Sequence, residues 1–127
     1  MGVTLSAHNV SDYSPGDRMQ ASQARDRTHS ELLAGLIDKL KATQEADGSS
    51  LFDHVAVAFE ANISTQHYLT NCPTVLTGVR VNLQLGQHLV LPKDTPLCNV
   101  WLTMLQVMGI NAERHGDSTG VVKDLQA

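Results

Sequence analysis

The sequence predicts an α/β fold in which a small mixed or parallel sheet is flanked by a long N-terminal helix and a C-terminal helix. Three observations lead to this class. Apolar residues with helical spacing occupy residues 32–40, a continuously apolar run occupies residues 54–59, and helix start and stop signals bracket residues 94–109. The chain of 127 residues has the length of one domain, so residues 1–127 are predicted to form a single domain.

The first helix is predicted to begin near Ser14. Ser14 can cap a helix, Pro15 suits the first turn, and Asp17 favours the positive helix end. Residues 18–30 are polar, and the turn residues 47–50 (DGSS) stop the helix. The apolar side chains fall on one stripe, which comprises Leu32, Leu33, Leu36, Ile37 and Leu40.

Strands are predicted in the middle of the chain. Residues 54–59 (HVAVAF) indicate a buried strand, because a continuous apolar run between turn signals is typical of parallel or mixed sheets. Residues 73–77 form a second strand that ends at Gly78. The loop 60–71 follows the carboxyl end of the first strand, where open α/β sheets usually bind ligands. Residues 81–91 are predicted to form a hairpin that turns at Gly86.

The last helix has the clearest signals. Asp94 or Thr95 caps it, Pro96 occupies its first turn, and Gly109 is the glycine that follows its end. Its apolar residues follow a 3,4 spacing, and Trp101 and Leu105 among them are expected at the centre of the core; the full set is Leu97, Val100, Trp101, Met104, Leu105 and Met108. Residues 111–127 are expected to be ordered only in part.

Composition narrows the classes of partner. The net charge is −4 and no basic stripe exists, so nucleic acid is not an expected partner. No apolar run approaches the roughly 18 residues of a membrane span. The first ten residues lack the features of a signal peptide, so the chain as it stands is expected in the cytoplasm. Cys72 and Cys98 have no metal-site spacing and are interpreted as small core residues, while a disulfide between them stays open.

Four segments resemble the C-terminal region of a bacterial protein family: residues 40–64, 67–78, 86–110 and 113–120. The most specific pieces are LKAT at 40–43, DTPLCN at 94–99 and GDSTG at 116–120. The family comprises secreted, twin-arginine-exported proteins of unknown function in the alkaline-phosphatase-like (sulfatase-like) superfamily. Its members are several times longer, and their nucleophile and several metal ligands come from an N-terminal half that this chain lacks. The resemblance therefore implies a truncated alkaline-phosphatase-like fold.

The resemblance also points to candidate site residues. The family loop reads His-x-His-x-Asn-Leu-Pro, and here His67, Asn71 and Pro73 match while Leu69 replaces the second His. Near the N-terminus, residues 8–12 (HNVSD) are similar to the family's His-x-x-Ser-His segment, with an acidic residue in the position of the second His.

Chemistry gives these residues two roles. Imidazole and carboxylate groups can hold Zn²⁺ or Ca²⁺, so the candidate metal ligands are His8, Asp12 and His67. A His beside an Asp can also act as a general base, so the candidate catalytic residues are His67, Asp12 and Asn71. The opposing interpretation is that all of them are exposed polar loop residues. The remaining candidates, His54, His88 and the group His115, Asp117 and Ser118, are interpreted as structural or solvated.

Two functions stay open. The first is a small metal-assisted hydrolase that acts on an ester, lactone, phosphate or sulfate as its small-molecule substrate. The alternative is a non-catalytic structural or interaction module that retains part of the fold. In a truncated fold the apolar strands 55–59 and 74–77 would leave an open sheet edge, which predicts a homodimer or higher homo-oligomer; the competing outcome is a monomer in which residues 81–91 fold over that edge.

Overall fold

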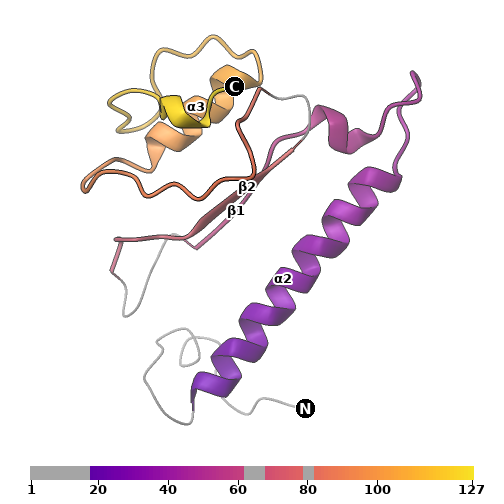
Figure 1. Cartoon of the computed structure of the whole chain (residues 1–127), viewed down its shortest axis with the longest axis horizontal. Coiled ribbons are helices and arrows are strands. Elements are labelled where there is room, and N and C mark those ends of the chain that lie inside the picture. The colour runs from indigo at the N-terminus through magenta and orange to yellow at the C-terminus, as the bar shows by residue number, and fades with distance from the viewer. Residues whose placement is uncertain (1–17, 62–67, 79–81) are drawn as a thin grey trace. The chain divides into compact units, whose positions relative to one another are not determined.

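The computed structural model describes residues 18–61, 68–78 and 82–127 (Figure 1). The helices are α2 (Arg18–Ala42) and α3 (Cys98–Val107), with two short 3-10 helices, η1 (Leu51–His54) and η3 (Lys123–Leu125). The strands are β1 (Val57–Glu60) and β2 (Thr74–Thr77). The predicted α/β class is therefore confirmed. Within the described ranges, no helix combines the length and the apolar character that crossing a membrane requires.

The chain divides into two compact units. One comprises residues 1–40 and 58–75, and the other comprises residues 41–57 and 76–127. The first unit contains most of α2, whereas the second contains η1, α3 and η3. Whether residues 1–127 behave as a single domain stays a prediction.

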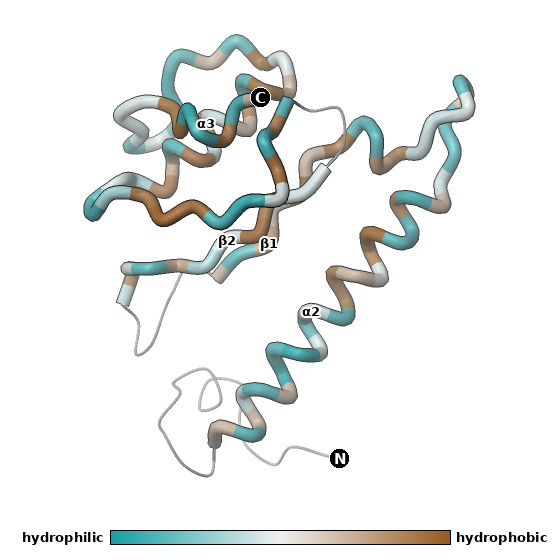
Figure 2. Tube along the Cα trace, in the orientation of Figure 1, coloured by the Kyte–Doolittle hydropathy of each residue, from teal (hydrophilic) through white to brown (hydrophobic). Residues whose placement is uncertain are grey.

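Helix α2 confirms the first predicted helix, although its predicted start at residues 14–17 lies outside the described residues. It ends at Ala42, before the predicted DGSS stop, because the chain then folds back on itself. The Leu51 amide donates to the Thr43 carbonyl at 2.8 Å, and Gln44 forms an antiparallel bridge with Ser50. Figure 2 shows a mostly hydrophilic first half of α2 and apolar residues in its second half.

The apolar stripe of α2 lies largely at the surface. Leu32 is 67% exposed and Leu36 is 47% exposed. Leu33, Ile37 and Leu40 are half-buried. The spacing thus predicted the helix but not the burial of that face.

Among the described residues the sheet has two strands, β1 and β2, which pair antiparallel, so the prediction of a parallel or mixed sheet is wrong. Next to the paired strands, the Ala61 amide donates to the Pro73 carbonyl at 3.3 Å. Val57 and Phe59 are half-buried while Ala58 is exposed. This alternation is typical of an antiparallel sheet with one solvated face, not of a strand buried on both faces.

The first strand begins later than predicted because residues 51–54 form η1 instead. The Asp53 carboxylate accepts hydrogen bonds from the backbone amide and the hydroxyl of Ser50, both at 2.9 Å. These bonds satisfy the start of a helical turn, and β1 can begin only after it. The second predicted strand, by contrast, is confirmed as β2.

The hairpin predicted over residues 81–91 is not found in its described part, residues 82–91. Leu83 instead forms an antiparallel bridge with Gln126. The Gln84 amide donates to the Leu125 carbonyl at 2.9 Å, and the Gln87 side chain donates to the Asp124 carbonyl at 2.6 Å. The last residues of the chain therefore take the place that residues 88–91 were expected to occupy.

The end of α3 follows the prediction and its start does not. Gly109 has a φ of 81°, its amide donates to Gln106 at 2.9 Å, and the Ile110 amide donates to Leu105 at 3.0 Å. These two bonds make a Schellman motif. At the other end, the N-cap is Leu97, so neither Asp94 nor Thr95 caps the helix and Pro96 lies before its first turn. Asp94 has a φ of 66° and lies in a turn.

The second unit holds the core. Its buried apolar side chains come from η1, the bridge to Gln126, α3 and the last segment: Phe52, Leu83, Val100, Leu102 and Val122. Trp101 and Leu105 are only half-buried, so the expectation that they form the centre is wrong. Residues 111–127 are all described and contribute Val122 to the core, so the expectation of partial order there is also wrong.

Candidate functional site

The structure places one of the four predicted site residues. His8, Asp12 and His67 lie outside the described residues. Asn71 lies in the connection before β2, is exposed to solvent, and has a left-handed backbone with a φ of 53°. Asn adopts this conformation more readily than most residues. No geometry between Asn71 and the other three residues follows from the described chain.

A metal site would depend on those three residues. Across residues 18–61, 68–78 and 82–127, no group of three or more His, Cys, Asp or Glu side chains is arranged to hold a metal ion. The Zn²⁺ or Ca²⁺ expected from the sequence therefore has candidate ligands only outside these ranges.

The structure does bring together two of the sequence segments that carry the resemblance, residues 94–99 and 116–120. The Asn99 side chain donates to the Thr119 hydroxyl at 3.2 Å, and its amide oxygen accepts the Thr119 backbone amide at 2.8 Å. One turn later on α3, the Thr103 hydroxyl donates to the Asn99 carbonyl at 2.7 Å and accepts the Val122 amide at 2.8 Å. Asn99 and Thr103 are buried, so α3 holds the final segment of the chain through polar contacts in its interior.

Cys98 and Asp117 make a second contact between the same segments. The pKa of the Cys98 thiol is raised, mainly because the thiol donates a hydrogen bond to the Asp117 side chain. A thiol held in its neutral form is a poor nucleophile and a poor metal ligand. Gly116 packs closely against the Cys98 sulfur. A Cβ at position 116 would lie only 2.8 Å from Cys98 Sγ. Cys98 and Cys72 are both free, so the two cysteines form no disulfide.

The residues His115, Asp117 and Ser118 do not assemble as a catalytic triad. The Ser118 hydroxyl accepts the backbone amide of His115 at 2.9 Å, and the Ser118 amide donates back to the His115 carbonyl at 2.9 Å. These bonds close a tight turn, while the Asp117 side chain faces Cys98. The contacts of these residues stabilise the loop and do not activate a nucleophile.

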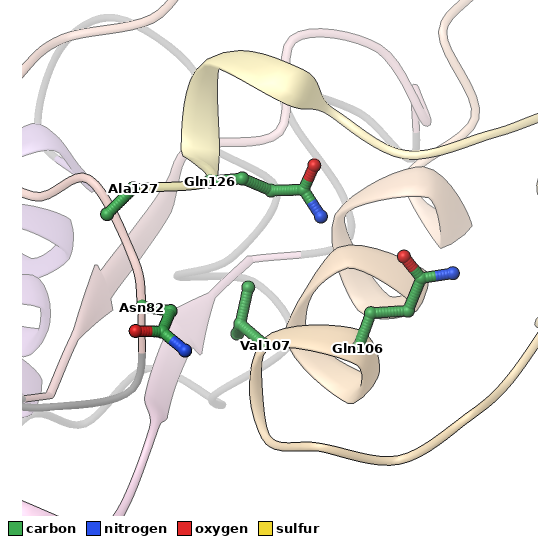
Figure 3. Close-up of a pocket in the computed structure, with 5 residues that line it drawn as sticks. All are labelled: Asn82, Gln106, Val107, Gln126 and Ala127. Atoms are coloured by element: carbon green, nitrogen blue, oxygen red, sulfur yellow. The ribbon is translucent and has the colours of Figure 1, made fainter.

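The second unit also contains an open pocket that the sequence did not predict (Figure 3). It measures about 420 Å³ and is lined by Asn82, Gln106, Val107, Gln126 and Ala127. Figure 3 shows Gln106 and Val107 on α3 and Gln126 and Ala127 on the last segment of the chain. The Gln106 amide also donates to the Ala112 carbonyl at 2.8 Å. The carboxamides of Asn82, Gln106 and Gln126 can form hydrogen bonds, but no lining side chain is an acid or a base, and no sequence motif marks the pocket.

No family model matches the chain, and no curated protein or solved structure matches it significantly.

Proposed function

We propose that this chain is a structural or interaction module that retains the last part of an alkaline-phosphatase-like fold. The supporting observation is the contact between residues 94–99 and 116–120, two of the most specific pieces of the resemblance. Their polar groups bond to one another, Asn99 to Thr119 and Cys98 to Asp117. Residues used in this way stabilise packing, and a chain could keep them for stability without keeping a catalytic centre.

The partner we propose is a second copy of the chain. The described sheet contains only β1 and β2, so each strand has one neighbour among the described residues. Val75 on β2 is 51% exposed, an apolar side chain on a strand that could accept a further neighbour. A strand from a second copy would satisfy the outer backbone groups and cover such side chains.

Sedimentation equilibrium at micromolar concentration tests this function. We expect a species of at least twice the monomer mass of 13.8 kDa. A single species at the monomer mass would reject self-association as the function of the module.

A metal-assisted hydrolase is the second candidate. One observation favours it: Asn71, which matches the family loop together with His67, is exposed where a small substrate can reach it. The donor chemistry of His8, Asp12 and His67 suits Zn²⁺ or Ca²⁺. A bound divalent cation would polarise an ester, lactone, phosphate or sulfate, or activate water. His67 or Asp12 would then hold the ion or accept a proton.

Metal analysis and a substrate screen test the second candidate. The purified protein should contain a divalent metal, and hydrolysis of an ester, lactone, phosphate or sulfate should stop when a chelator is added. His67→Ala should remove both properties without changing the circular dichroism, whereas the control His88→Ala should keep them. A folded His67→Ala protein with full metal content and full turnover would reject this mechanism.

A further inference from the structure

Three side chains form a hydrogen-bonded chain between the turn after α2 and the end of η1. Ser49 Oγ lies 2.5 Å from Asp47 Oδ1 and 2.6 Å from His54 Nε2. The Ser49 amide also donates to Asp47 Oδ1 at 3.0 Å. Backbone bonds fix the turn, because the Glu45 amide donates to the Ser49 carbonyl at 2.8 Å and the Gly48 amide donates to the Glu45 carbonyl at 3.0 Å. All of these residues belong to the second unit.

The positions of the protons follow from counting. Two heavy atoms that are 2.5–2.6 Å apart need a proton between them, and the Ser49 hydroxyl has only one. An aspartate is ionised at neutral pH, and the hydrogen bonds from Ser49, first of all from its side chain, lower the pKa of the Asp47 carboxyl group further. The Ser49 proton therefore goes to Asp47, and His54 supplies the other proton from Nε2. Neutral His54 is thus the Nε2–H tautomer, with its lone pair on Nδ1.

This arrangement makes Nδ1 more nucleophilic. A ring N–H that donates to an acceptor raises the electron density of the other ring nitrogen, as carboxylates do for histidines that bind metals. Here the acceptor is a hydroxyl that is itself polarised by a carboxylate, and bonds in such a chain strengthen one another. His54 is exposed, so Nδ1 is accessible to reagents in solution.

We propose that His54 Nδ1 is a nucleophile for neutral, activated acyl donors, which is an activity separate from the proposed module and from the metal-assisted hydrolase. Nδ1 attacks the carbonyl carbon, a bond from nitrogen to carbon forms, and the ester C–O bond breaks so that the alcohol leaves as its anion. The Nε2 proton passes towards Ser49 and Asp47 as the acyl-imidazole forms. Water then cleaves the acyl-imidazole to a carboxylic acid, and the protons return to the ring and to the alcohol.

The charge around the ring selects neutral donors. Asp47 is linked to the ring through Ser49. Its carboxylate repels an anionic phosphate or sulfate ester. The acyl donor is therefore an uncharged ester or anhydride.

Site-resolved acylation of the full chain tests the proposal. The probe is diethyl pyrocarbonate, and peptide mass spectrometry follows the rate at each histidine. His29, His88 and His115 are also exposed and serve as internal references. We expect His54 to react fastest, and we expect Ser49→Ala and Asp47→Asn each to lower its rate to that of the references. Equal rates at the four histidines, or a Ser49→Ala protein in which His54 keeps its advantage, would overturn the proposal.

Two further measurements separate activation from a merely structural role of Ser49. Nitrogen-15 NMR of the imidazole ring should show the Nε2–H tautomer in the parent protein and a mixture of tautomers in Ser49→Ala. Turnover of p-nitrophenyl acetate should fall in His54→Gln, stay unchanged in the matched control His88→Gln, and resist a chelator. Turnover that the chelator abolishes would assign the activity to the metal-assisted hydrolase and reject the role of His54.

Discussion

Buried polar residues on α3 decide how the end of the chain packs. Asn99 and Thr103 are spaced one turn apart on the helix, and their bonds to Thr119 and Val122 put this face inside. The 3,4 spacing of the apolar residues predicted a different inner face. Sequence reasoning missed it because a polar residue is usually assigned to the surface unless its partner is known.

Thr103→Val should destabilise the second unit. Thr103 is fully buried, and Val keeps its shape but leaves the Val122 amide without an acceptor. The expected loss is about 1–3 kcal/mol of unfolding free energy, measured by chemical denaturation. Thr28→Val is the matched control, since the Thr28 hydroxyl makes the same kind of bond, to the Ala24 carbonyl at 3.0 Å, on an exposed face. Equal effects of the two changes would contradict the role assigned to Thr103.

Asp117→Asn should make the Cys98 thiol react at lower pH. The hydrogen bond from the thiol to the Asp117 side chain raises the pKa of Cys98 above its ordinary value, and the negative charge of Asp117 raises it further. Removing the negative charge lowers that pKa, so the curve of alkylation rate against pH shifts towards acid. Iodoacetamide labelling resolved by peptide measures the shift, with Cys72 as the internal reference. A curve for Cys98 that does not move would show that Asp117 does not control it.

The elements themselves were easier to predict than their faces and partners. The end of α3 and the existence of α2 and β2 followed from local signals, such as the glycine at 109 and the turn residues near 47–50. Strand direction and the pairing of Leu83 with Gln126 depend on contacts between residues far apart in the chain. Local patterns contain no information on such pairs, and this is why the predicted hairpin over 81–91 was wrong.

The inner face of α3 can be tested by comparing two leucines. Leu102 is 2% exposed, whereas Leu105 is half-buried. Leu102→Ala should lower the unfolding free energy by about 2–5 kcal/mol because it leaves a cavity in the core. Leu105→Ala should cost clearly less. Thermal denaturation of both variants compares the two losses of stability. A larger loss for Leu105→Ala would show that the inner face of α3 is the one predicted from the sequence.

The residue after β2 must be glycine. Gly78 has a φ of 148°, and a Cβ there would collide with the Val55 carbonyl oxygen. Gly78→Ala should therefore cost more than about 1 kcal/mol of unfolding free energy. Gly35→Ala is the matched control, because that glycine lies inside α2 with open space around it, and Ala there should stabilise by roughly 0.5–1 kcal/mol. Gly78→Ala with parent stability would show that residues 55 and 78 do not pack closely.

For the whole molecule, the α/β class and the final helix could be predicted from the sequence. Neither of them determines how the candidate site residues lie relative to one another. Asn71 alone among the predicted site residues is placed, and it lies on a loop whose conformation no periodic pattern predicts. The hydrogen bonds that link Asp47, Ser49 and His54 were visible only in the structure. It depends on the fold of a turn, so the sequence interpretation of His54 as the start of a strand hid its contact with Ser49.

The proposed self-association through β2 should be sensitive to charge on the exposed face of the strand. Val75→Lys places a charged group where 51% of the side chain already faces solvent, so the monomer should fold as before. A lysine at a sheet edge opposes pairing with another strand, and the mass found by sedimentation equilibrium should fall to that of the monomer. Val90→Lys is the control, since Val90 is 84% exposed and lies outside both strands. Association that survives Val75→Lys but is lost in Val90→Lys would move the interface from the strand edge to the segment around Val90.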